Sequence, residues 1–128
     1  MEWQDNYNVG ITSIDKQHQK LFHMINKLEK SMNSDTVCHT MGEILKDLVD
    51  YVKFHFEDEE KIMSRIGYPE LEQQKTKHKE LIDRVVNILQ DLKHGENVES
   101  VDLYVFLKNW FVGHILEEDK KIGDYFFQ

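Results

Sequence analysis

The chain has few of the residues that break regular secondary structure or crosslink a small fold. Its 128 residues include one proline, six glycines and one cysteine, Cys38. So little proline and glycine is unusual for an all-β domain with many tight turns, and it favours long helices. A single cysteine excludes an internal disulfide framework and is too isolated for a zinc site or a redox pair. We therefore expect a helical protein in a reducing, cytoplasmic compartment.

Basic residues and long apolar runs are also scarce. The chain carries 16 Lys and Arg against 24 Asp and Glu, a formal net charge of -8. This charge gives no attraction to nucleic acid or to an anionic membrane surface. No apolar run approaches the roughly 20 residues of a transmembrane helix, and the first residues lack the basic start of a secretory signal. We predict no nucleic-acid partner and no membrane association, and the sequence points to no particular protein partner.

What the sequence does contain is four segments with apolar residues at three- and four-residue intervals. They predict helices over about residues 12–32, 36–66, 69–94 and 100–120, preceded by an ordered aromatic arm over residues 1–11. Short polar turns join the segments, and the length suits one domain. We predict an all-α fold, a single antiparallel up-down-up-down four-helix bundle.

Each predicted helix places a histidine on its apolar stripe, namely His18, His55, His78 and His114. Glu59 follows His55 by one helical turn, so both lie on one inward face. A lone core histidine is usually a satisfied core residue, but an ionised carboxylate in a core is costly without a cation. Four histidines and a carboxylate at one level of a bundle would bind iron, zinc or copper. This set predicts a metal site.

The acidic ligand from the fourth helix is ambiguous. Asp119 lies five residues after His114, about 140° around a regular helix, whereas Glu118 lies four residues after it. Either the helix is locally widened near Gly113, which would bring Asp119 inward, or Glu118 is the ligand. Spacing alone slightly favours Glu118. The acidic run around Glu59, by contrast, predicts a solvated face: Glu57, Asp58 and Glu60.

Together these residues resemble the bacterial hemerythrins, single-domain non-haem diiron proteins that bind oxygen. The specific part of the resemblance is a His-xxx-Glu motif and a His-Ile-xxx-Asp motif on separate helices. The matching stretches cover nearly the whole chain: Trp3 with residues 9–11, residues 14–21, residues 55–60, Tyr68 with Pro69, His78, and residues 110–115 with Asp119.

The resemblance implies two iron ions bridged by carboxylates and an oxo or hydroxo group. It assigns His18 and His55 to one iron, His78 and His114 to the other, and Glu59 and Asp119 to the bridges. It thereby selects Asp119 over Glu118, against the spacing argument. In that family, O2 binds at whichever of the two irons has fewer histidine ligands. The resemblance therefore also implies reversible O2 binding, for storage, delivery or sensing. Candidates for the apolar wall of the O2 pocket are Ile115, Trp110 and Phe22.

One ligand position departs from the family pattern. The family has a histidine four residues before His78, and this chain has Gln74. Either the amide oxygen of Gln74 ligates iron, a water takes the position, or Glu70 reaches in from one turn earlier. A carboxamide is a poorer donor to iron than imidazole, so we predict a second iron that is held more weakly and oxidised more easily. The departure keeps two alternatives open: a diiron enzyme that reduces peroxide, O2 or nitric oxide, and a structural bundle without functional metal.

Overall fold

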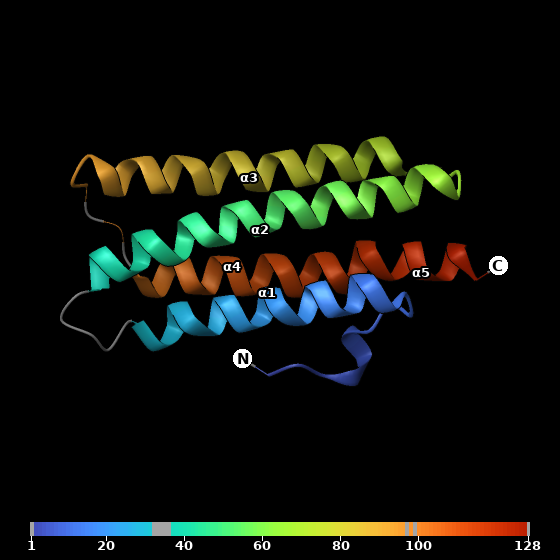
Figure 1. The fold of residues 1–128 in the computed structure, drawn as a ribbon, viewed down its shortest axis with the longest axis horizontal. Helices are drawn as coiled ribbons and strands as arrows, with labels where there is room; N and C mark the ends of the chain where they lie inside the picture. The colour runs from blue at the N-terminus through green and yellow to red at the C-terminus, as the bar shows by residue number, and fades with distance from the viewer. Residues whose placement is uncertain (1, 32–36, 97, 99, 128) are drawn as a thin grey trace.

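The computed structural model describes residues 2–31, 37–96, 98 and 100–127. Within these parts the chain forms no strand, and its helices run along the long axis of the molecule in alternating directions (Figure 1). The elements are η1 (Asp5–Tyr7), α1 (Thr12–Ser31), α2 (Val37–Arg65), α3 (Leu71–Lys93), α4 (Ser100–His114), η2 (Ile115–Asp119) and α5 (Lys120–Phe126). Because α4, η2 and α5 follow one another without a break, they form the fourth helix of the bundle. The predicted all-α four-helix bundle is confirmed.

The N-terminal arm is bonded to the start of α1. Asp15, in the first turn of α1, accepts the backbone N–H of Val9 through Oδ1 at 2.7 Å. The rings of Trp3 and Tyr7 pack edge-on against Phe22, with centroids 5.0 and 5.3 Å from its ring. The hydrogen bond to the Asp15 carboxylate and the aromatic cluster therefore hold the arm along α1. In Figure 1 the arm lies below that helix.

A glycine turn sets the antiparallel pairing of α2 and α3. Gly67 has a φ of +68°, the left-handed conformation that commonly ends a helix. The N–H of Tyr68 donates to the carbonyl of Met63 at 2.9 Å, and that of Gly67 to Ser64 at 3.2 Å. These bonds satisfy the last carbonyls of α2 and reverse the chain. The next helix begins at Leu71, two residues later than the periodicity predicted.

The fourth helix is longer than predicted. We expected it to end near residue 120 and to be followed by an aromatic tail, but α5 continues to Phe126. Between α4 and α5 lies η2, a π-helical turn in which the N–H of Lys120 donates to the carbonyl of Ile115, five residues back. A π turn widens a helix without ending it, so the backbone stays bonded and the helix goes on.

Two apolar clusters fill the bundle, and a polar layer separates them. The larger cluster includes Phe56, and the smaller one consists of Met63, Tyr68 and Ile122. Along α2, Glu59 lies between Phe56 and Met63, so the change from apolar to polar and back takes place within two helical turns. The layer crosses the bundle toward the end where α2 meets α3.

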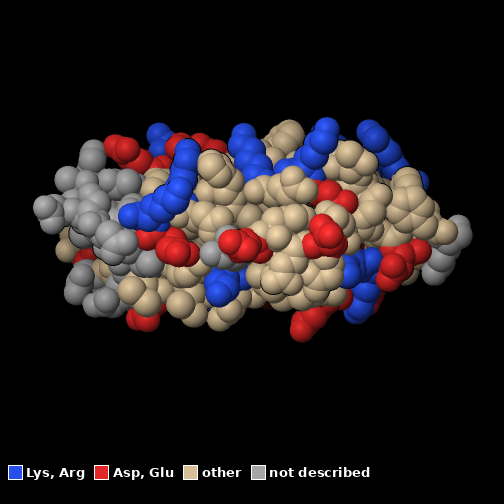
Figure 2. Space-filling model, turned by 90° about the horizontal axis from the view of Figure 1, so that it is seen from below, with Lys and Arg blue, Asp and Glu red and all other residues tan. Residues whose placement is uncertain are grey.

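One face of the molecule is mixed in charge. On the face shown in Figure 2, acidic and basic side chains are interspersed among the coloured residues. No helix in the described parts of the chain has the length and apolarity needed to cross a bilayer. The large apolar side chains exposed in these parts are Phe54, Val101, Val105, Phe126 and Phe127.

Candidate metal centre

The buried polar side chains gather in one layer of the bundle. Within the described residues they are His18, His55, Glu59, Gln74, His78, His114 and Asp119, each no more than 7% exposed. All seven belong to the set that the sequence singled out. Burying so many polar groups costs free energy unless they share partners. The layer is therefore the place to look for chemistry.

The layer divides into two groups of potential ligand atoms, and within each group all these atoms lie within 4.8 Å of one another. The first group, the His18 subsite, consists of His18, His55, Glu59 and Asp119. The second, the His78 subsite, consists of His78, His114, Glu59 and Asp119. Both subsites contain two imidazoles, and both carboxylates belong to both subsites.

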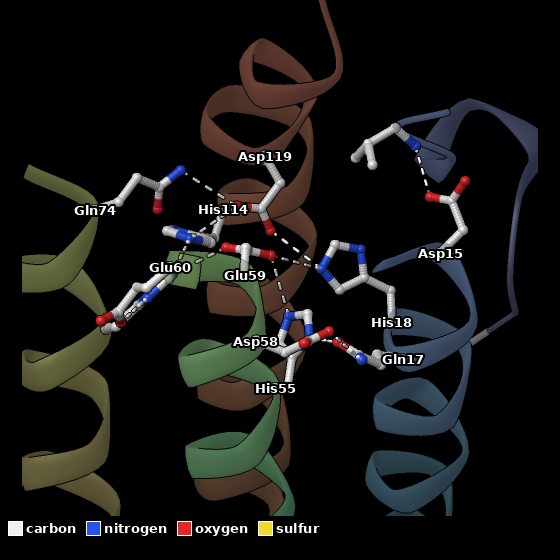
Figure 3. Close-up of polar contacts among 12 residues, drawn as sticks. Asp15, Gln17, His18, His55, Asp58, Glu59, Glu60, Gln74, His114 and Asp119 are labelled. Carbon is white, nitrogen blue, oxygen red and sulfur yellow. Dashed lines mark hydrogen bonds and ion pairs between the residues drawn. The ribbon is translucent and has the colours of Figure 1, made fainter. Parts of the chain in front are cut away.

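Glu59 faces the two subsites through different oxygens. Its Oε2 lies 3.3 Å from Nε2 of His55, one turn earlier on α2. Its Oε1 lies 3.2 Å from Nε2 of His78 on α3. Figure 3 shows the carboxylate of Glu59 between the labelled histidines of the site. One oxygen for each subsite is the arrangement of a carboxylate that can bridge two cations.

Asp119 does the same from the fourth helix. Its Oδ2 lies 3.2 Å from Nε2 of His18, and its Oδ1 lies 3.2 Å from Nε2 of His114. The π turn explains this orientation, because its hydrogen bonds stack residues five apart. Glu118 turns away from the layer and forms an ion pair with Lys77. The spacing preference for Glu118 is therefore wrong, since it assumed a regular helix.

Two histidines are oriented through their outer nitrogens. Nδ1 of His55 lies 2.6 Å from Oε1 of Gln17, whose Nε2 donates to Asp58 at 2.9 Å. Nδ1 of His78 lies 2.9 Å from Oε2 of Glu60. Because these oxygens only accept, both rings donate from Nδ1 and turn Nε2 inward, where it can carry a proton or bind a cation. The prediction of a solvated acidic face is wrong for Asp58 and Glu60, which the packing of α2 against α1 and α3 brings to these contacts.

The two buried carboxylates require positive charge nearby. Burial opposes a charge on His18, but its contacts with Asp119 and Glu59 outweigh burial and raise the pKa of His18 to about 9. Burial likewise opposes a charge on His78, yet Glu59 and Glu60 raise its pKa. Burial also opposes the charges of Glu59 and Asp119, but the surrounding imidazoles hold the pKa of both carboxyls below ordinary values. The layer binds either protons or a cation.

Several buried atoms of the layer make no hydrogen bond, although some lie at ion-pair distance from one another: both ring nitrogens of His18, both carboxylate oxygens of Glu59, and Oε1 of Gln74. Buried polar atoms without partners are rare and need a reason. Imidazole nitrogens and carboxylate oxygens together suit divalent iron, zinc or manganese. The residues present therefore fit transition-metal ions, and a bound cation would satisfy the unpartnered lone pairs.

Gln74 lies beside the His78 subsite. Its Nε2 donates to Oδ1 of Asp119 at 3.3 Å, and Figure 3 shows the amide turned toward that carboxylate. Glu70, the alternative ligand one turn earlier, belongs to neither subsite. Its carboxylate instead accepts a hydrogen bond from the hydroxyl of Tyr68 at 3.1 Å.

Aromatic rings cover the histidines of the His78 subsite. Phe56 stacks on His78 with ring centroids 3.7 Å apart and planes within 3°. Trp110 stacks on His114 at 4.5 Å and 13°. Such stacking fixes the ring planes and keeps water from one face of each imidazole. Phe56 is the closer of these two rings, and no sequence pattern separates it from the other core aromatics.

The three residues predicted to wall an O2 pocket have different surroundings. Trp110 contacts a histidine of the site, Ile115 is buried in the larger apolar cluster, and Phe22 packs against the N-terminal arm. A surface hollow of about 240 Å³ has Trp110 and His114 in its lining. The role of Trp110, Ile115 and Phe22 in O2 binding stays a prediction.

Known proteins share both the sequence pattern and the fold. The sequence model of the hemerythrin HHE cation binding domain matches residues 9–126. A bacteriohemerythrin from Stenotrophomonas maltophilia is 34% identical over 95% of this chain and 78% of its own length. One from Clostridium acetobutylicum is 31% identical over 95% of this chain and 98% of its own. The crystal structure of a wild-type hemerythrin superposes with a TM-score of 0.89, at 29% identity, over 97% of this chain and 95% of the other.

Proposed function

The chain belongs to the hemerythrin family, and from this membership and the geometry of the buried layer we propose that it binds O2 reversibly at two iron ions. Membership in this family implies non-haem iron and O2 binding. The observation that carries the proposal is that each carboxylate turns one oxygen to each subsite. This arrangement suits two cations that share two bridges.

In the proposed site the two subsites hold one iron each. The irons supply redox and O2 chemistry when bound, and the protein supplies ligands, orientation and a dry environment. The proposed ligands are His18 and His55 for one iron, His78 and His114 for the other, and Glu59 and Asp119 for both.

The other residues of the site orient and protect these ligands. Gln17 and Glu60 fix the rings to which they are hydrogen-bonded and increase the donor strength of the inward nitrogens. Phe56 and Trp110 cover two imidazoles and limit water entry, which slows the proton-driven loss of a bound ligand. Ile115, together with Phe22, is proposed as further apolar wall.

Reversible oxygenation tests this function. The iron-loaded protein is reduced under anaerobic conditions, and its visible spectrum is recorded in air and again after deoxygenation, over several cycles. We expect an absorption band that appears in air and disappears without it. Glu59→Ala should abolish the band, whereas Glu57→Ala, at an exposed position two residues away, should keep it. Direct passage to a stable ferric spectrum would exclude a carrier.

The second candidate function is reduction of peroxide, O2 or nitric oxide. The observation that favours it is that, among the residues that the structure describes, each subsite contains two imidazoles and no third, together with the hollow beside His114. Fewer protein ligands leave more positions for small molecules. Sustained turnover of one of these substrates with an electron donor would establish an enzyme, and absence of turnover beside reversible oxygenation would leave O2 binding as the function.

A further inference from the structure

The amide of Gln74 is oriented by its neighbours. Only 1% of the residue is exposed, and its Nε2 donates to Oδ1 of Asp119 at 3.3 Å. The opposite orientation would set the amide oxygen against a carboxylate oxygen, which is repulsive. The hydrogen bond therefore determines which end of the amide meets Asp119. The other end, Oε1, is buried and has no hydrogen-bond partner.

This orientation makes the two subsites different. The His18 subsite offers two imidazole nitrogens and the two shared carboxylates. The His78 subsite offers the same kind of set. In addition, the amide of Gln74, whose oxygen has no hydrogen-bond partner, is bonded to Oδ1 of Asp119, the carboxylate oxygen that lies 3.2 Å from His114 of this subsite. Imidazole suits iron, zinc and copper, whereas carbonyl and carboxylate oxygens suit harder cations such as Mn²⁺. The extra donor is thus one that favours the harder ion.

We propose that Gln74 is a specificity-determining ligand of the His78 subsite, which binds its cation through Oε1 and shifts the preference of that subsite toward Mn²⁺ relative to Zn²⁺. The inference rests on the proposed metal site and concerns the relative ion preference of one half of it. In this arrangement the amide has two tasks. Its oxygen binds the cation, and its N–H holds the bridging Asp119 in the orientation that serves both subsites.

Metal titrations of the metal-free protein test this ion preference without using O2 chemistry. Mn²⁺ binding is followed by the loss of the electron paramagnetic resonance signal of free Mn²⁺, and Zn²⁺ affinity by competition against bound Mn²⁺. The variants are Gln74→His, which adds a third imidazole, and Gln74→Leu, which removes the oxygen. Gln73→His is the matched control, because that neighbouring residue is exposed.

We expect Gln74→His to raise the ratio of Zn²⁺ to Mn²⁺ affinity at one of the two sites by about tenfold or more. Changes to residues that support a metal ligand alter metal affinity on the same scale, about 10- to 100-fold. Gln74→Leu should weaken Mn²⁺ at one site and leave the other unchanged, and Gln73→His should match the parent protein. Two bound metals with the same affinity ratio in all variants would overturn the role of Gln74 alone. No binding of either metal would overturn this inference and the proposed function together.

Discussion

Metal removal should make the stability of this protein strongly dependent on pH. In the unfolded chain His18 has its ordinary pKa of 6.5, and in the metal-free fold its pKa is about 9. The fold therefore holds this proton more tightly than the unfolded chain does. The resulting stabilisation is fully present below pH 6.5, decreases as the pH rises, and is lost above about pH 9.

The size of the effect follows from the same shift. The difference between 6.5 and about 9 corresponds to about 3 kcal/mol of unfolding free energy, since one pH unit is worth about 1.4 kcal/mol. Little solvent screening reduces it, because His18 is 1% exposed. His78, whose pKa is also raised, acts in the same direction. A bound cation takes the place of these protons, so the metal-loaded protein should not show this loss.

Urea unfolding at about pH 6 and about pH 9.5, with a chelator or with Zn²⁺, measures the effect. We expect the chelated protein to lose on the order of 3 kcal/mol between the two pH values and the Zn²⁺-loaded protein to lose much less. His18→Gln should remove most of the loss, and His23→Gln, at an exposed position on α1, should keep it. A chelated protein whose stability is the same at both pH values would refute the argument that buried carboxylates hold protons here.

Two further predictions concern residues outside the ligand set. Glu60→Ala should leave the protein folded but speed metal loss to a chelator by about 10- to 100-fold, because His78 loses the hydrogen bond that orients its ring. Glu57→Ala, at an exposed position, should leave the rate of metal loss unchanged. Equal rates in the two variants would contradict the role of the Glu60 carboxylate. Gly123→Ala would set a Cβ 1.9 Å from the carbonyl oxygen of Val9, so we expect the arm to shift and the unfolding free energy to fall by about 1–3 kcal/mol. At Gly42 an added Cβ meets nothing within 4 Å, so Gly42→Ala should stabilise the helix by about 0.5–1 kcal/mol. A similar effect of Gly42→Ala and Gly123→Ala in urea unfolding would refute the close approach of Gly123 to Val9.

The four-helix bundle could be predicted from the sequence because the apolar residues recur at regular helical spacing and the helices are long. Stripes such as Ile14, Leu21, Ile25 and Leu28 on α1 are buried as their spacing predicts. The residues at which the helices begin and end were harder to predict. The start of α3 at Leu71 depends on the turn that closes α2, and local periodicity does not carry that information.

The inward turn of Asp119 was the hardest feature of the site to predict. Spacing arguments assume about 100° per residue, and that assumption fails in a π turn. Nothing in the residues 115–119 themselves separates a π turn from an α turn. Only the resemblance to a family selected Asp119 over Glu118, and the structure explains why the spacing argument failed.

The residues that orient the histidines were missed for a different reason. Gln17 and Glu60 flank the inward stripes of their helices, where a side chain points either to solvent or to a neighbouring helix. Which of these occurs depends on how α1, α2 and α3 pack together. For Gln74, the sequence revealed a missing imidazole, but the use of its N–H by Asp119 emerges only when α3 and η2 meet.

Whether each subsite holds its own iron is decided by the number of iron ions per chain, measured in the parent protein and in two double variants. One variant, His18→Ala with His55→Ala, removes the imidazoles of one subsite, and the other, His78→Ala with His114→Ala, removes those of the second. We predict about two irons in the parent protein and about one in each variant, because the ligand atoms form two groups. A parent protein with one iron or none, or two irons that survive both pairs of substitutions, would contradict it.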